Sequence, residues 1–397
     1  MTIRVVLLGA VHPGSGPDAK MRGLADTFTD LGCAVSLTLV PPDRRAVRTL
    51  QRALQTEHTT AGSAPNSAPA GTAPGRTAPA DTTPFGTAPG ETAPDVVLAR
   101  SHWALPPLIP SLRRLRHRHG TRLVIDVPTP TAAGMREIAG SSRPWPERAG
   151  RLGIEGAWIP SAWPWADLVV QYDRDGLPWR LIAPRRRLTL TNGVRVADRP
   201  LAPDWASRTS MAFVTAGSIG QWHGVDRLLR GMSAAQEHGS TLTIVGDGPE
   251  LGRLRSLTSR LGLDDRVRFT GPLTGAAYDR ELAAADITVA SLGEHRRGHS
   301  SLSPLKTRDY LARGLPMLFA GDDPDLRGNP PFTFRAPDDD SAIDLAAVAT
   351  WLQHLRGAAT CEAPEADVAP TAIRRFATDH LDQADRARAI LTALRLP

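Results

Sequence analysis

The feature that most constrains this chain is an alternation of short apolar runs with helix-like segments, present in both halves of the sequence. In the first half, β-branched runs at residues 3–9 and 33–40 flank a helical pattern at 17–32 that ends at Gly32. Further strands are expected at 95–99, 122–127, 166–172 and within 183–193. In the second half, strands are expected at 210–218, 240–248, 266–273, 286–292 and 316–321. Apolar runs joined by helices are typical of parallel sheets covered by helices, so we predict an α/β fold of two Rossmann-like domains that face a cleft.

A Ser/Thr-Ala-Pro repeat at residues 56–94 interrupts the first alternation. The segment has almost no large apolar side chains, so burial cannot offset the entropy lost on ordering it. We therefore expect a disordered Pro/Ala/Thr-rich insertion in a loop of the first domain. A docking tether is the functional alternative, although loops accept extra length at little cost in free energy.

The Asn192-Gly193 turn signal marks the predicted boundary between the domains. We expect a first domain over 1–193, a second over 194–375, and a C-terminal helix within 376–397 that packs back toward the first domain. In open α/β sheets ligands bind beyond the carboxyl ends of the strands, so the predicted site lies there.

Composition narrows the function classes. The net charge of +6 allows anionic partners such as nucleotides, lipid head groups or nucleic acid, without choosing among them. No segment approaches the roughly 20 apolar residues that cross a bilayer, and the N-terminal run is interpreted as a strand and not a signal peptide. Cys33 and Cys361 give neither a metal cage nor a disulfide framework, and we expect a cytoplasmic protein. The sequence contains no Walker loop, His-Glu-x-x-His or Gly-x-Ser-x-Gly motif, which disfavours P-loop enzymes and metal hydrolases.

Residues 286–316 combine an apolar run, a loop rich in Arg, His and Ser, and a helical pattern with Lys306, Arg308 and Asp309. A strand, a basic loop and a helix start suit a phosphorylated, hydroxyl-rich ligand, because the loop supplies cations and the helix dipole favours an anion. The alternative interpretation is a solvated charged loop before an ordinary surface helix.

Three further loops follow expected strands. Residues 245–249 form a glycine turn, and 217–227 place His223 between Trp and Gly. Residues 12–16 precede the first helix with two glycines, a pattern that can cradle a phosphate. For each loop the alternative is an ordinary turn, and for His223 a structural role.

The second half resembles the retaining, nucleotide-sugar-dependent glycosyltransferases of the GT-B fold, family-4 type. The resemblance is carried by AGSIGQWHGVDRLLRG, TIVGDGPELGRL, LGLDDRVRFTGPL, LAAADITVASL and SPLKTRDYLARGLP, in the family's order and spacing. The TrpHisGly form with SPLKTRDYLARG is similar to a subgroup of polysaccharide and surface-glycan enzymes. The first half matches more loosely.

The resemblance implies roles for particular residues. Of two acidic residues separated by seven others, the second usually holds the nucleotide ribose and matches Asp309, whereas the first contacts the donor sugar and its position is Ser301. The diphosphate-gripping Arg and Lys of the family match Ser218 and His223, so the missing charge is expected from Arg296, Arg297 or Lys306.

The expected catalytic residues are Asp126 near the acceptor, and His223 and Lys306 at the diphosphate. The expected donor-binding residues are Gly14, Gly16, Ser218, Gly246, Asp247, Gly248, Arg296, Ser301, Leu305, Lys306 and Asp309. The resemblance implies that cations and N–H groups replace a metal, that no cofactor is needed, and that the departing phosphate deprotonates the acceptor.

The predicted function is transfer of a hexosyl group from a nucleotide-diphosphate sugar to a glycan, lipid-linked or small-molecule hydroxyl, with retention, in glycan or glycoside biosynthesis. A non-catalytic GT-B-like subunit that supports a partner transferase is the alternative, motivated by Ser301. Nucleic-acid binding is a third class, motivated by arginines at 113–118 and 185–187. No nucleic-acid-binding motif accompanies these arginines, so we expect no nucleic-acid partner.

A basic helix at 108–119 with Leu108, Leu112 and Leu115 adds peripheral contact with the inner membrane surface as a hypothesis. The alternative is that this apolar stripe packs on the sheet of the first domain.

Overall fold

The computed structural model describes residues 2–13, 15–43, 45–56, 93–128, 131–139, 144–172, 185–202, 205–235, 239–297, 303–360 and 369–396. Gly14, Ser301 and most of the predicted insertion, residues 57–92, lie outside these ranges. The chain divides into two compact units: unit 1 comprises residues 1–190 with 387–397, and unit 2 comprises 191–386.

Unit 1 is built on a parallel six-stranded sheet in the order β2-β1-β3-β4-β5-β6. The strands are β1 (Arg4–Ala10), β2 (Ala34–Val40), β3 (Val96–Arg100), β4 (Arg122–Val127), β5 (Leu168–Gln171) and β6 (Arg187–Thr189). Each coincides with an apolar run expected from the sequence, which confirms the α/β prediction for this half.

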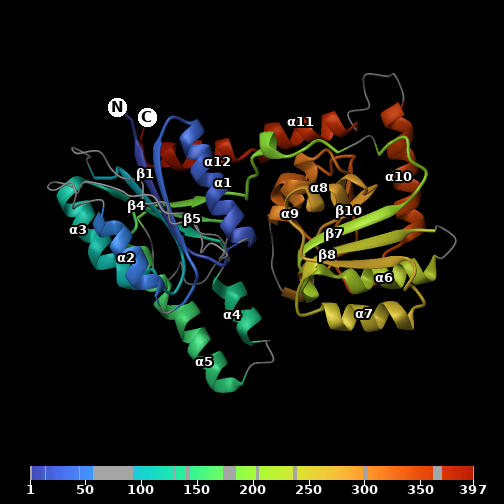
Figure 1. Cartoon of the computed structure of the whole chain (residues 1–397), viewed down its shortest axis with the longest axis horizontal. Coiled ribbons are helices and arrows are strands. Elements are labelled where there is room, and N and C mark those ends of the chain that lie inside the picture. Colours follow the sequence, from blue (N-terminus) through green and yellow to red (C-terminus); the bar gives the residue numbers. More distant parts are fainter. Residues whose placement is uncertain are drawn as a thin grey trace, which may run out of the picture. The chain divides into compact units, whose positions relative to one another are not determined.

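Both faces of this sheet are buried. Along β1, Val5 and Leu7 pack with Phe28 of α1, whereas Val6 and Leu8 join the opposite cluster that contains Leu112. Figure 1 shows α1 on one side of the sheet, and α2 and α3 on the other. Neighbouring residues of a strand point to opposite faces, so a continuous apolar run is what a doubly covered strand requires.

The unit 1 helices are α1 (Gly16–Asp30), α2 (Ala46–Thr56), α3 (Ile109–His119), α4 (Thr131–Ala139) and α5 (Trp145–Gly153). Short 3₁₀ segments span Pro106–Leu108 and Pro160–Trp165, and a π-helix spans Ile154–Trp158. Ser15 caps α1 by accepting a hydrogen bond from the Asp18 N–H. The apolar stripe of α3 is buried in the unit 1 core, as the sheet-packing alternative predicts.

Unit 2 repeats the architecture with the strand order β12-β11-β10-β7-β8-β9, again parallel. The strands are β7 (Ala212–Ser218), β8 (Thr241–Asp247), β9 (Val267–Gly271), β10 (Ile287–Val289), β11 (Met317–Phe319) and β12 (Thr333–Arg335). The helices are α6 (Val225–Ala234), α7 (Leu251–Arg260), α8 (Gly275–Ala283), α9 (Leu305–Ala312), α10 (Leu345–Thr360) and α11 (Pro370–Leu381). In Figure 1, α6 and α7 lie side by side along one face of this sheet, and α8 and α9 lie on the other.

Further 3₁₀ segments of unit 2 span Val196–Asp198, Gln221–His223, Glu294–Arg297 and Pro324–Leu326. Two parallel sheets, each covered by helices, confirm the prediction of two Rossmann-like halves.

The C-terminal helix expected within 376–397 is divided between two helices. α11 ends at Leu381 and α12 spans Gln383–Ala393, with Asp382 between them in an extended conformation. The Asp382 carboxylate accepts hydrogen bonds from the N–H groups of Ala384 (2.8 Å) and Val196 (3.4 Å), so it caps the second helix and holds the break. Beyond the break, Ile390 and Leu391 of α12 are buried in the core of unit 1.

None of the helices in the described ranges is both long enough and apolar enough to span a bilayer.

Candidate functional site

The predicted donor-site residues of unit 2 gather where β7, β8 and β10 end and α9 begins. β7 and β8 run in register to their last residues, with Gly217 beside Gly246 and Ser218 beside Asp247. Ser218 and Asp247 are exposed at this edge, and the Asp247 carboxylate accepts a hydrogen bond from the Gly248 N–H (2.7 Å). The carboxyl ends of parallel strands are where open α/β sheets bind ligands.

Gly246 allows the two strand ends to approach this closely. Its φ is +125°, and a Cβ at this position would lie 2.0 Å from the Gly217 carbonyl oxygen. Any side chain would therefore push β7 and β8 apart and strain the backbone. The glycine turn predicted from the sequence is thus a ledge without side chains, at which Gly217 is exposed and Gly246 is half-buried.

The amine of Lys306, in the first turn of α9 just after the half-buried Leu305, lies beside this ledge. A Cβ on Gly217 would be 3.9 Å from both the Cε and the Nζ of Lys306. The Nζ atom is shielded from solvent and has no hydrogen-bond partner among the described residues. Burial lowers the pKa of Lys306 to about 7, and the charge of Glu294 opposes that shift. A buried cation without a partner is costly, so the site favours an incoming anion.

Glu294 was not singled out by the sequence, although it is the one acidic residue between Asp286 and Asp309. It is 7% exposed and begins the 3₁₀ segment Glu294–Arg297. A Cβ on Gly321 would lie 3.4 Å from the Glu294 Cβ, which places this carboxylate near the end of β11. The sequence did contain a signal for Glu294, because it is a single acidic residue in an otherwise basic loop.

The Trp-His-Gly turn is bound to the loop after β10. The Leu292 N–H donates to the His223 carbonyl (3.0 Å), and the Gly293 N–H donates to the Trp222 carbonyl (3.0 Å). Gly224 has a φ of +59°, and a Cβ there would lie 2.7 Å from the Leu292 carbonyl carbon. Glycine at this position therefore lets the start of α6 meet the loop that carries Glu294.

His223 is buried, at 6% exposed, and its ring bonds to the backbone of its own turn. Its Nδ1 accepts a hydrogen bond from the Gly220 N–H at 2.9 Å. The ring thus stabilises the turn at the end of β7, a structural role that is compatible with the predicted place beside the diphosphate.

Arg296 is held by carboxylates of unit 2. Its guanidinium makes a bidentate ion pair with Asp226, and its Nε donates to Asp340 at 2.8 Å. Burial acts to raise the pKa of Asp226, but hydrogen bonds and charge from Arg296 and Arg230 outweigh it and lower that pKa to about 2. Arg296 therefore fixes the loop after β10 to the start of α6.

Asp309 lies one turn after Lys306 on α9, where three polar side chains surround its carboxylate. It accepts a hydrogen bond from the Tyr278 hydroxyl (2.9 Å) and pairs with Arg199 (2.7 Å) and Arg313 (3.1 Å). Burial and the Asp309 charge raise the pKa of the Tyr278 hydroxyl. Arg308, in contrast, is fully buried and pairs with Asp323 and Asp325.

The candidate residues of unit 1 form a separate cluster at the carboxyl ends of its strands. Asp126 is 1% exposed; its Oδ1 lies 3.3 Å from the Lys20 Nζ and its Oδ2 lies 3.5 Å from Arg100 Nη1. The Lys20 Nζ also lies 3.4 Å from the ring centre of Tyr172. Burial lowers the pKa of Lys20 to about 8, against the attraction of Asp126. Gly16 is the exposed first residue of α1.

The chain has two lysines, Lys20 and Lys306. All its other Lys or Arg positions are arginine. Each lies in a helix at the carboxyl edge of its own sheet, and each has a lowered pKa because of burial. Burial removes the charge of lysine more readily than that of arginine. Gly14, Ser301 and the side chain of Arg297 lie outside the described part of the chain.

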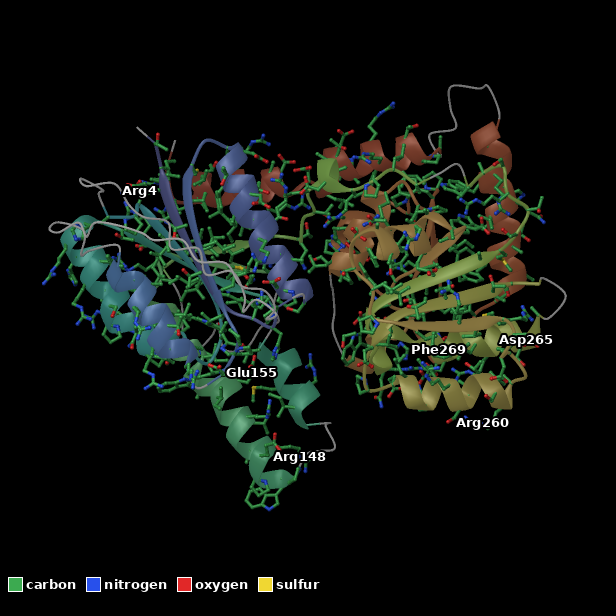
Figure 2. All side chains as sticks on the ribbon, in the orientation of Figure 1. Arg4, Arg148, Glu155, Arg260, Asp265 and Phe269 are labelled. Carbon is green, nitrogen blue, oxygen red and sulfur yellow. The ribbon has the colours of Figure 1, made fainter. Side chains whose placement is uncertain are left out.

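A groove of about 780 Å³ opens at the opposite end of β8. Its lining includes Thr241, Arg255, Arg266 and Phe269, and Figure 2 labels Phe269 and Asp265 there. None of the predicted donor-site residues lines this groove.

Comparison with protein families gives a match over residues 210–330 to the family described as Glycosyl transferases group 1. These residues contain β7 to β11, the glycine ledge and α9. A search of curated proteins gives no match.

Solved structures with a similar fold cover nearly the whole chain at low sequence identity. Sucrose-phosphate synthase from Thermosynechococcus elongatus has a TM-score of 0.63 and 14% identity, with coverage of 99% of this chain and 98% of that one. HepE from Anabaena in complex with UDP has a TM-score of 0.60 and 13% identity, with coverage of 99% and 100%. The catalytic domain of starch synthase IV from Arabidopsis thaliana, bound to ADP and acarbose, has a TM-score of 0.62 and 10% identity, with coverage of 99% of both chains. The chain thus has the GT-B fold, and its residues 210–330 match the family of glycosyl transferases group 1, which together support a glycosyltransferase of the GT-B type.

Proposed function

We propose that this protein transfers a hexosyl group from a nucleotide-diphosphate sugar to an acceptor hydroxyl, with retention of anomeric configuration. The observation that carries the proposal is the shielded Lys306 amine, without a described hydrogen-bond partner, beside the ledge of Gly217 and Gly246. A diphosphate leaving group gains negative charge as the glycosidic bond breaks. A preorganised cation and backbone N–H groups in a shielded place stabilise that charge.

In this proposal Lys306 binds the diphosphate and the glycine ledge contacts it through backbone groups. The charge of Glu294 favours the protonated form of Lys306 and so partly offsets the effect of burial. Asp309 binds the ribose, and Ser301 contacts the donor sugar. Asp126 of unit 1 acts on the acceptor, and the departing phosphate takes the acceptor proton. UDP and ADP in the similar structures support a nucleotide ligand of this class.

The reaction is proposed to need no metal, since Lys306 supplies the cation. The acceptor belongs to the classes predicted from sequence: a glycan, a lipid-linked sugar or a small molecule. The sequence also led to the hypothesis of peripheral membrane contact, which concerns residues of unit 1 outside the donor site.

The test is a thermal-shift screen against UDP, GDP, TDP and ADP with EDTA present, followed by incubation with the nucleotide sugars of any stabilising base. A ligand that binds the native state alone raises the melting temperature. The proposal predicts stabilisation by at least one nucleotide and release of that nucleotide from its sugar when an acceptor is added. No stabilisation by any nucleotide would remove the donor site from unit 2.

A non-catalytic subunit that supports a partner transferase is the second candidate, because serine stands at position 301 where the family usually has an acidic residue. It predicts nucleotide binding without turnover by the purified chain, and turnover only after a partner is added. Nucleotide release by the purified chain alone would exclude it.

A further inference from the structure

Exposed large apolar side chains are concentrated in one short part of unit 1. Among the described residues they are Trp145 (72% exposed), Ile154 (41%), Trp158 (46%), Trp165 (41%) and Leu201 (41%). Four of these five lie within residues 145–165. Single exposed apolar residues are normal on a surface, but such a concentration of tryptophan indicates an interaction site.

The helices that carry these side chains are poorly covered by the rest of unit 1. Neither α5 nor the π-helix Ile154–Trp158 contains a buried residue. Contact with α4 comes through Arg148, whose Nη1 donates to the Ala139 carbonyl (2.9 Å), and through Gly156 beside Met135. Figure 2 labels Arg148 and Glu155 on this projection, and Figure 1 shows α5 extending away from the unit 1 sheet.

Ile154 and Trp158 are four residues apart, so they share one side of the helix. The Trp158 indole N–H donates to the Trp103 carbonyl at 2.9 Å, which fixes the ring while it remains 46% exposed. Trp145 lies nine residues before Ile154, which is about half a turn out of phase and therefore on the other side.

Trp165 connects this aromatic side to the basic face of α3. The Arg113 guanidinium lies 4.1 Å from the Trp165 ring centre, and Arg116 donates to the Trp165 carbonyl at 3.4 Å. Arg114 and Arg118 are exposed on the same helix. The leucines of α3 are buried in the core, so α3 supplies charge and the segment 154–165 supplies the apolar groups.

We propose that Ile154, Trp158 and Trp165, with the exposed arginines of α3, form a surface that docks on an anionic lipid bilayer. Tryptophan is enriched at the membrane–water interface, where its ring meets the acyl boundary and its N–H meets the headgroups. Arginine adds attraction to anionic headgroups. The exposed charge supports an anionic lipid surface as the occupant, because α3 presents the exposed cations Arg113, Arg114 and Arg118 beside Trp165. None of the residues named for this surface belongs to the proposed donor or acceptor site.

The experiment is co-sedimentation of the full chain with vesicles of equal phosphatidylglycerol and phosphatidylcholine, and with vesicles of phosphatidylcholine alone, at low and physiological salt. The aromatic variant is Trp158→Ser with Trp165→Ser, and the charge variant is Arg113→Gln with Arg114→Gln and Arg118→Gln. Trp145→Ser is the matched control, since it removes a more exposed tryptophan from the other side. The melting temperature of each variant is compared with that of the wild type.

The wild type should bind anionic vesicles and not neutral ones. The partition coefficient of the aromatic variant for anionic vesicles should be at least tenfold lower than that of the wild type. The charge variant should lose the part of the binding that depends on salt concentration. The partition coefficient of Trp145→Ser should stay within twofold of the wild-type value. Brominated acyl chains should quench wild-type tryptophan fluorescence, a readout that needs no variant to fold. Absence of binding at low salt would overturn the proposal. So would equal loss in Trp145→Ser and the aromatic variant, or equal binding to soluble polyglutamate, which would indicate an acidic protein partner.

Discussion

Arg296 and Asp226 form a bidentate ion pair across 70 positions of sequence, with Nη1 2.8 Å from Oδ1 and Nη2 3.1 Å from Oδ2. The pair joins the loop after β10 to the first turn of α6. That loop carries Glu294, whose charge acts on Lys306. The ion pair therefore fixes the loop that carries Glu294 next to the proposed diphosphate site.

Loss of this pair should be seen in the pH dependence of stability. The folded-state pKa of Asp226 is lowered from 3.8 to about 2, so its contribution is present above pH 4 and is lost as the pH falls toward 2. The shift corresponds to about 2 kcal/mol at neutral pH. Urea unfolding of Asp226→Asn should show lower stability than the wild type at pH 7 and a smaller difference near pH 3. A difference independent of pH would contradict this assignment.

Lys306→Met should stabilise the free protein and remove nucleotide binding. The folded-state pKa of Lys306 is lowered from 10.5 to about 7, so the penalty for the buried amine is fully present below pH 7 and disappears as the pH rises toward 10.5. Because the side chain is half-buried, we expect a gain of about 1–3 kcal/mol at pH 6.

Urea unfolding at pH 6 and pH 9 measures the gain from Lys306→Met, and calorimetry measures nucleotide binding. Wild-type binding at pH 8 should take up a proton, since an adjacent anion favours the charged amine. Lys20→Met is the contrasting variant, because Lys20 lies beside Asp126 in unit 1 and its removal should leave nucleotide affinity unchanged. Undiminished nucleotide affinity in Lys306→Met would exclude Lys306 from the site.

Gly246→Ala should destabilise the protein by about 2–4 kcal/mol, because the added Cβ would collide with the Gly217 carbonyl in a backbone region that favours glycine. Gly252→Ala is the control. Gly252 lies on α7 with open space around it, where alanine should add about 0.5–1 kcal/mol. Equal thermal stability of the two variants would show that the strand ends accept a side chain.

Asp309→Ala tests ribose binding by its specificity. The variant should weaken binding of the preferred ribonucleotide by about 1.5–3 kcal/mol, the value of a hydrogen bond to a charged group. It should also remove the preference for ribose over 2′,3′-dideoxyribose. If the preference survives, Asp309 acts only through its cluster of Tyr278, Arg199 and Arg313.

Ser301→Glu tests the donor-sugar position. Serine removes one negative charge relative to the family pattern, so the wild type should accept deoxy or amino sugars and the variant should shift that preference. Turnover with a panel of nucleotide sugars measures the shift, with nucleotide affinity as the control. An unchanged donor profile would show that residue 301 does not contact the sugar.

The sequence predicted the strands of both sheets well because buried parallel strands are continuous apolar runs. It did not predict β12, whose three residues Thr333–Arg335 are at most half-buried, so they give no apolar run. It also did not predict α5, a nine-residue helix that buries none of its side chains in the described part of the chain.

At the candidate site, Lys306 and Gly246 were predicted because motif spacing marks them. The partner of Arg296 was not, because a contact between residues 226 and 296 depends on the tertiary fold. The place of Arg296 in the donor site stays a prediction, and its ion pair with Asp226 is what the fold adds.

The two lysines allow local unfolding of each unit to be detected by proteolysis. Lys20 lies in α1 of unit 1 and Lys306 in α9 of unit 2, each with its amine shielded. An endoproteinase that cleaves only after lysine should leave the native chain intact until one of these helices unfolds. The first fragment to form would then identify which unit opens first, because a cut after residue 20 belongs to unit 1 and a cut after residue 306 belongs to unit 2.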